Sequence, residues 1–143
     1  MHIIVGSDHA GYALKKYIIH HIEQNYTTDI LHDVGADGED SVDYPDYGYA
    51  VARRVVEHTG SLGIVVCGSG IGISIAANRV AGARAALCTG VEMARLAREH
   101  NDANILALGA RLITPELALA CVDTFLTTLF EGGRHEQRVK KLG

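Results

Sequence analysis

A cysteine at the start of a glycine-rich segment is the residue in this sequence best suited to chemistry. Cys67 is followed by Gly68-Ser69-Gly70-Ile71-Gly72, which holds three glycines in five positions. Glycines let the backbone approach a ligand closely, and a helix that begins here leaves N–H groups free for an anion. The positive potential of a helix N-terminus also favours the thiolate form of a neighbouring cysteine. We therefore expect Cys67 to be functional rather than a small core residue.

The other two cysteines are expected to be structural. Cys121 lies between Leu117 and Phe125 at helical spacing, and Cys88 has no comparable loop beside it. Three cysteines are an odd number without clustered spacing, which argues against a disulfide framework or a zinc site and favours a reducing compartment.

The glycine-rich loop differs from three better-known phosphate loops. A dinucleotide fingerprint needs its third glycine at position 73 and should follow the first strand, whereas residue 73 is Ile and the loop follows the third predicted strand. A cysteine phosphatase loop would need an arginine at position 73, where this sequence has Ile. A nucleotide-binding loop with Gly-Lys-Ser or Gly-Lys-Thr is absent from the sequence.

Three further acid–base candidates lie at the ends of predicted elements. Asp8 and His9 follow the first strand, where they could bind or protonate a sugar oxygen; Asp8 could equally be a helix cap beside a solvent-facing His9. His100, followed by Asn101, closes a later helix, where the helix dipole alone would also favour a histidine.

Three arginines could bind a phosphate group. Arg111, Arg134 and Arg138 carry guanidinium groups, which bind phosphate in a fixed bidentate geometry. Arg134 and Arg138 are four residues apart, so a helical tail would place them on one face. The alternative is a basic tail that is simply solvated.

The elements that must position these residues alternate along the chain. Apolar runs predict strands at 2–7, 29–34, 62–67, 84–88 and 103–108. Helices are predicted at 11–25, 45–58, from the 68–72 turn to about 79, at 91–100, and from Thr114 to the Gly132-Gly133 pair, where a basic tail follows.

This alternation predicts an α/β fold, a three-layer α/β/α sandwich around a five-stranded parallel sheet of the Rossmann or flavodoxin-like type. The expected order is the flavodoxin-like one, with the first strand next to the third. Ligands bind such sheets beyond the carboxyl ends of the strands. Ser7-Asp8-His9 and Cys67-Gly68-Ser69 should therefore lie side by side.

Composition narrows the class of protein. The 143 residues, 48% apolar and 21% charged, suit a single globular domain over 1–143. The net charge of −4 indicates neither nucleic acid nor an anionic membrane as a partner. The short apolar start is not typical of a signal peptide, so we expect a cytoplasmic protein.

Five motifs together resemble one enzyme family. They are Ser7-Asp8-His9-Ala10-Gly11, Asp43-Tyr44-Pro45-Asp46, Cys67-Gly68-Ser69-Gly70-Ile71-Gly72, His100-Asn101 and Leu108-Gly109-Ala110-Arg111. In this order they are similar to type B ribose-5-phosphate isomerases, whose wider family includes allose- and galactose-6-phosphate isomerases. The resemblance covers essentially the whole chain.

The resemblance implies a role for each matching residue. Cys67 would be the base that moves a proton between two sugar carbons, with Ser69 close to that proton. The amides of the 68–72 loop would bind the enediolate oxygen, and Asp8 and His100 would assist ring opening. The remaining substrate contacts would come from His9, Tyr44, Asn101, Arg111, Arg134 and Arg138.

The resemblance also implies a homodimer or a dimer of dimers with sites at the subunit interface. The segment from His100 to Arg111 would serve the site of the partner. Ser69 departs from the threonine of many members but keeps the hydroxyl. The galactose-6-phosphate enzymes divide their functional residues between two different chains, whereas this chain carries the full set.

Isomerisation needs a base, an oxyanion site and a phosphate anchor, and the sequence offers all three. No acidic cluster has metal-ligand spacing, so we expect no metal and no cofactor. Two rival interpretations stay open. One is a phosphocarrier domain of sugar transport, in which the cysteine follows the first strand rather than the third; the other is a non-catalytic binding module on the same fold.

Overall fold

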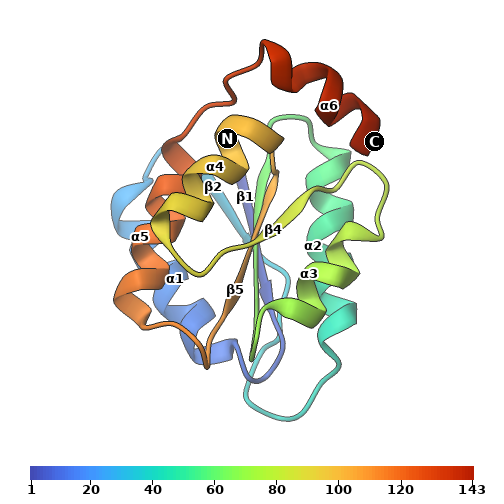
Figure 1. The fold of residues 1–143 in the computed structure, drawn as a ribbon. Helices are drawn as coiled ribbons and strands as arrows, with labels where there is room; N and C mark the ends of the chain where they lie inside the picture. The colour runs from blue at the N-terminus through green and yellow to red at the C-terminus, as the bar shows by residue number, and fades with distance from the viewer.

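The computed structural model describes residues 1–143 as a parallel sheet between two layers of helices (Figure 1). The strands are β1 (His2–Ser7), β2 (Ile30–Asp33), β3 (Leu62–Cys67), β4 (Ala85–Leu87) and β5 (Ile105–Gly109). The helices are α1 (Tyr12–Asn25), α2 (Tyr44–Glu57), α3 (Ile71–Asn78), α4 (Val91–Asn101), α5 (Pro115–Thr127) and α6 (Arg134–Leu142). None of these helices has both the length and the apolar content needed to cross a membrane.

The sheet order is β2-β1-β3-β5-β4, with every neighbouring pair parallel. The predicted α/β class and the pairing of β1 with β3 are therefore confirmed. The last two strands are exchanged relative to the expected flavodoxin-like order. Burial explains the exchange, because β5 is fully buried along its length whereas the three residues of β4 are only half-buried, as suits an edge strand.

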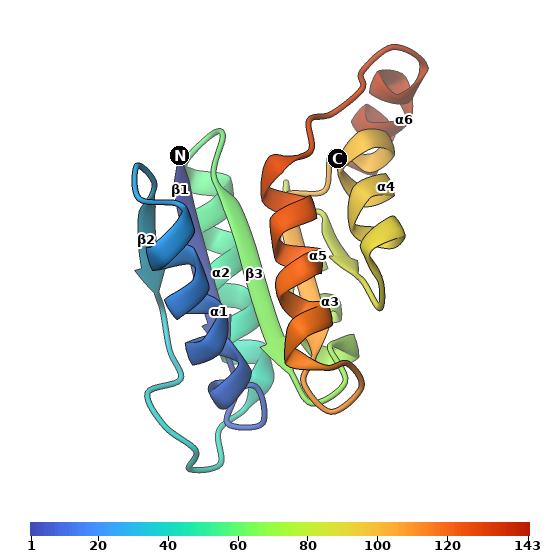
Figure 2. The same cartoon turned by 90° about the vertical axis from the view of Figure 1, so that its left-hand side faces the viewer.

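Alternate residues of the strands pack into two separate hydrophobic cores, one on each face of the sheet. Helices α1, α4 and α5 cover one face and α2 and α3 cover the other (Figure 2). Ile3 and Val5 of β1 join the first core, while Ile4 joins the second. Cys67 belongs to the second core, so its side chain emerges on the side of α2 and α3.

The predicted last helix is wrong at its carboxyl end. The Thr114 hydroxyl accepts a hydrogen bond from the Leu117 N–H (3.1 Å), which confirms it as the cap, but α5 ends at Thr127 rather than at the glycine pair. Hydroxyls of Thr127 and Thr128 bond back to carbonyls one turn earlier, both at 2.6 Å. The basic tail then forms a helix of its own, α6, which lies against α4 (Figure 1).

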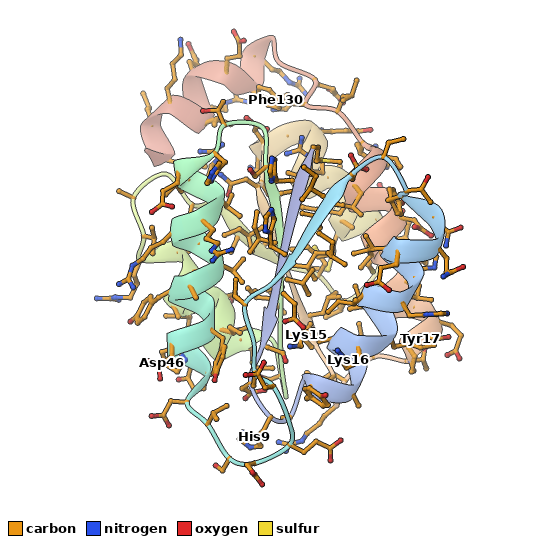
Figure 3. The ribbon with its side chains drawn as sticks, turned by 180° about the vertical axis from the view of Figure 1, so that it is seen from behind. His9, Lys15, Lys16, Tyr17, Asp46 and Phe130 are labelled. Atoms are coloured by element: carbon orange, nitrogen blue, oxygen red, sulfur yellow. The ribbon has the colours of Figure 1, made fainter.

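One charged side chain is completely buried between α1 and the sheet. The Lys15 ammonium donates to Asp33 Oδ1 (2.7 Å) and to the Ala36 carbonyl (2.6 Å). Its neighbour Lys16, labelled beside it in Figure 3, is exposed. Lys15 thus fixes the start of the loop between β2 and α2, which carries part of the site described below.

Replacing Lys15 should test this anchor. Lys15→Met keeps the unbranched stem but leaves the Ala36 carbonyl without its ammonium donor and the Asp33 carboxylate with only the Gly35 N–H, so the free energy of unfolding should fall by about 1–3 kcal/mol. Urea denaturation measures the change. Lys16→Met is the matched control and should change stability by less than about 0.5 kcal/mol. Equal effects of the two substitutions would contradict the anchoring role.

Candidate functional site

The carboxyl ends of β1 and β3 meet at one edge of the sheet, as expected. Ser7 pairs with Val66, and the Asp8 N–H donates to the Val66 carbonyl at 3.2 Å. The segments that follow the two strands, Asp8-His9 and Cys67-Gly68-Ser69, are therefore neighbours although they are some sixty positions apart in the sequence. We call this edge the cysteine edge.

The loop after β3 folds back over the thiol. The Gly70 N–H donates to Cys67 Sγ (3.2 Å), and the Ile71 N–H donates to the Ser69 hydroxyl (3.1 Å). Gly70 adopts a φ of 78°, a left-handed conformation that favours glycine. Helix α3 begins at Ile71, so the next two amides, those of Gly72 and Ile73, have no acceptor in a preceding turn and lie at this edge.

Close contact with the end of β5 explains two of the glycines. A Cβ on Gly109 would lie 2.4 Å from the Ser69 carbonyl oxygen, and one on Gly70 would lie 2.6 Å from Leu87 Cδ1. The Ala110 N–H donates to the Cys67 carbonyl and the Arg111 N–H to the Gly68 carbonyl, both at 2.9 Å. The loop is therefore held by the backbone of the neighbouring strand rather than by side chains.

Two large side chains border the loop. A Cβ on Gly68 would lie 3.0 Å from Arg111 Nη1, and a Cβ on Gly72 would lie 2.5 Å from the Tyr44 ring. Arg111 and Tyr44 thus flank the loop on either side, the first from the turn after β5 and the second from the first residue of α2. Both are exposed enough to reach a ligand.

Asp8 and His9 have defined hydrogen bonds. Asp8 is buried and its carboxylate accepts from the Gly11 N–H (3.0 Å), so it stabilises the turn before α1, but the helix cap itself is Gly11 and not Asp8. His9 Nδ1 accepts from the Val42 N–H (3.1 Å). A neutral imidazole with Nδ1 as acceptor carries its proton on Nε2, which leaves His9 an N–H donor for an anion.

The other predicted site residues lie at the opposite edge of the sheet. Helix α4 ends at Asn101 and the chain enters β5 at Ile105, whereas Cys67 is paired with Gly109, four residues further along β5. Four residues of strand span about 13 Å. Figures 1 and 3 show the two edges, with α6 and Phe130 at one end of the molecule and His9 at the other.

This second group, which we call the histidine edge, is basic, and it includes a half-buried His100 as well as exposed arginines. His100 stacks on His135 of α6, with ring centroids 4.3 Å apart and planes at 15°. Arg134 and Arg138 are exposed and form no salt bridge within the chain, unlike the following arginines, which are paired: Arg84, Arg95 and Arg98. A single chain therefore does not bring all predicted site residues together.

One expectation about the two groups is wrong in part. The resemblance assigned the whole segment from His100 to Arg111 to the site of the partner. Arg111 instead lies against Gly68 of its own chain, because the turn after β5 is at the same edge as Cys67. Only His100 and Asn101 of that segment lie at the opposite edge.

Comparison with known proteins decides the family. The model of the family described as Ribose/Galactose Isomerase matches residues 3–142. This chain belongs to that family. Its structure is similar to ribose-5-phosphate isomerase B from Clostridium thermocellum, with a TM-score of 0.94 and 53% identity over 100% of this chain and 95% of that one.

Two further relatives support the match. The chain is 49% identical to ribose-5-phosphate isomerase B of Mycobacterium leprae over 97% of this chain and 86% of the relative. It is 40% identical to the Mycoplasma genitalium enzyme, whose structure contains bound ribulose-5-phosphate, with a TM-score of 0.93 and coverage of 99% and 93%.

Two contacts at these edges could not be predicted from the sequence. His135 lies in the basic tail, and its stacking on His100 depends on α6 folding back against α4, which no local pattern signals. Val42, whose amide sets the tautomer of His9, lies in a loop without periodicity. Both contacts join segments that are distant in the sequence.

The three thiols differ in their surroundings. Cys88 and Cys121 are buried among apolar side chains, as predicted. Burial, with a smaller contribution from neighbouring Cys121, raises the pKa of the Cys88 thiol to about 12, and burial also raises the pKa of Cys121. Cys67 is also buried, but its sulfur accepts a hydrogen bond from the Gly70 amide of the glycine-rich loop.

Alkylation should therefore be selective. At pH 8 the thiols with raised pKa values hold almost no thiolate, so iodoacetamide should modify Cys67 of the folded protein first. Peptide mass spectrometry of a time course measures the order, with Cys67→Ser as the control that should stay unmodified until denaturant is added. Faster labelling of Cys88 or Cys121 would contradict the assignment.

Proposed function

We propose that this chain is an aldose–ketose isomerase that interconverts ribose 5-phosphate and ribulose 5-phosphate through an enediolate, with Cys67 as the base. The observation that carries the proposal is the cysteine edge, where a thiol, the amides of a helix N-terminus and Arg111 converge. The identity of the substrate is inferred from the relatives named as ribose-5-phosphate isomerase B, one of which has ribulose-5-phosphate bound.

Proton transfer is the central step of the proposed reaction. The Cys67 thiolate removes the proton from C2 of the open-chain aldose and returns it to C1, and a second proton passes from O2 to O1. The Gly70 N–H donates to Sγ, a hydrogen bond that strengthens when the sulfur carries negative charge. The Ser69 hydroxyl, two residues from the thiol, is placed to relay the proton between the two oxygens.

The oxyanion site is built from backbone. Charge that develops on the enediolate oxygen would be stabilised by amides of the 68–72 loop at the start of α3. Loss of one such donor typically raises a barrier by about 3 kcal/mol. The tight fit of this loop on Gly109 keeps the donors fixed, so little reorganisation accompanies the charge.

The remaining roles divide between the two edges. At the cysteine edge, His9 Nε2 and Arg111 would bind phosphate, Tyr44 would pack on the sugar, and Asp8 would assist ring opening. At the histidine edge, His100 would be the ring-opening acid and Asn101 would hold a hydroxyl, while Arg134 and Arg138 would complete the phosphate site.

Such a division implies that each site is made by two chains of a homodimer, or of a dimer of dimers. A two-fold axis perpendicular to the strands reverses the partner, so the cysteine edge of one chain faces the histidine edge of the other. Exposed apolar side chains beside edge strand β4 support an interface there: Ile71 and Ile75 on α3, and Val91 and Met93 on α4.

The base can be tested directly. Cys67→Ala should lower kcat for ribose 5-phosphate by about 10²- to 10⁴-fold, because no other group at this edge replaces the thiolate. Turnover of ribose 5-phosphate is measured with EDTA present and is compared with turnover of allose 6-phosphate, the alternative substrate. Cys88→Ala is the matched control, a buried thiol outside the site, and should keep its turnover. Near-normal activity of folded Cys67→Ala would exclude the cysteine mechanism.

The two-chain site can be tested by mixing inactive variants. Cys67→Ala and His100→Ala should each be inactive alone, but unfolding and refolding them together should restore about a quarter of wild-type activity, since half of the dimers would be mixed and each would hold one intact site. A mixture that stays inactive, while refolded wild-type protein recovers, would place all the residues of one site in one chain.

A further inference from the structure

A cluster of metal-binding side chains lies at the histidine edge. His100 of α4, Glu131 of the loop before α6, and His135 of α6 each offer one ligand atom, and these atoms lie within 4.8 Å of one another. The loop is tied to the helix beneath it, because the Glu131 N–H donates to the Glu99 carbonyl at 3.1 Å. Two imidazoles and a carboxylate form a ligand set typical of divalent transition metals.

One atom of this cluster is buried without a hydrogen-bonding partner. His135 is more than nine-tenths buried, and its Nε2 has no hydrogen bond in the structure. The same nitrogen faces Glu131 Oε1 at 3.7 Å, too far for a hydrogen bond. Buried polar atoms without partners are rare in native proteins, so this nitrogen points to a ligand.

The charges around His135 favour its neutral form. Burial lowers its pKa most, and His100, Arg134 and Arg138 lower it further, while Glu131 acts in the opposite direction. A metal binds the deprotonated nitrogen of an imidazole, and the lowered pKa of His135 acts in the same direction as the unpartnered Nε2. The two arginines also repel a cation, which the Glu131 carboxylate partly offsets.

We propose that His100, Glu131 and His135 form a binding site for one divalent transition metal ion of the Zn²⁺ class. Tetrahedral zinc with ligands at about 2.1 Å places neighbouring ligand atoms about 3.4 Å apart. His135 Nε2 and Glu131 Oε1 are already close to that spacing. His100 is half-buried and Glu131 is exposed, and metal binding would turn the His100 ring out of its stack on His135 so that its nitrogen lone pair points to the same position as the other two ligand atoms.

Occupation of this site would inhibit the isomerase. A metal on His100 takes the lone pair and the proton position that ring opening uses, so the ion acts as a reversible inhibitor and not as a cofactor. This consequence rests on the proposed function, whereas metal binding itself does not. Binding and inhibition are therefore measured separately.

A second histidine group is the main competitor for the ion. His2, His32 and His58 lie together at the start of the sheet, but His2 Nδ1 and His32 Nε2 already share a hydrogen bond of 2.8 Å. The Arg54 charge also acts on His32, lowering its pKa after burial and His2. Cys67 is a further competitor, since thiolates bind zinc.

Titration of the full chain tests the proposal. Metal-free protein is titrated with Zn²⁺ in a calorimeter, and turnover of ribose 5-phosphate is followed over the same range. Glu131→Gln removes one ligand and lies outside the proposed catalytic set, while Glu136→Gln on α6 is the matched control. Cys67→Ser and His58→Gln report binding at the competing groups.

We expect one Zn²⁺ per chain on the wild type and on Glu136→Gln, with activity lost and then restored by EDTA. Glu131→Gln should keep its basal turnover and bind at least about tenfold more weakly. Unchanged affinity in Glu131→Gln, or loss of the same binding event in Cys67→Ser or His58→Gln, would overturn the site. Binding at the site without inhibition would uphold the metal site and overturn the acid role of His100.

Discussion

The placement of the Cys67 thiol depends on one backbone contact, that between the loop after β3 and the end of β5. A Cβ on Gly109 would come within 2.4 Å of the Ser69 carbonyl, so the two backbones touch with no side chain between them. This contact forces Gly70 into its left-handed conformation and turns its N–H onto the sulfur. The same turn sets the direction in which the amides at the start of α3 point.

Parallel strands impose the division of the site. All five carboxyl ends lie at one edge, and every crossover helix returns the chain to the other. Residues that end a strand, such as Cys67, and residues that end a helix, such as His100, are therefore separated by the length of the sheet. The proposed reaction uses both groups, so it would need a second copy of the chain, and one interface around a two-fold axis would complete two sites at once.

Local patterns in the sequence were sufficient for most of the fold. Apolar runs predicted all five strands, and the glycine-rich loop predicted the position of the thiol. Each of these signals is contained within a few consecutive residues. The exchange of β4 and β5 was not visible, since strand order depends on the relative burial of whole strands. The end of α5 was missed because the threonine hydroxyls that close it are weaker signals than a glycine pair.

The histidine edge combines exposed positive charge with a buried histidine, His135, whose pKa is lowered by burial and by its neighbours. Arg134 and Arg138 project from a basic helix on a chain of net charge −4, and neither is neutralised by a carboxylate of its own chain. Their field attracts a phosphate monoester and also disfavours protonation of the buried His135. A phosphate bound between the arginines would weaken that field, so substrate binding itself would make it easier for this edge to hold a proton.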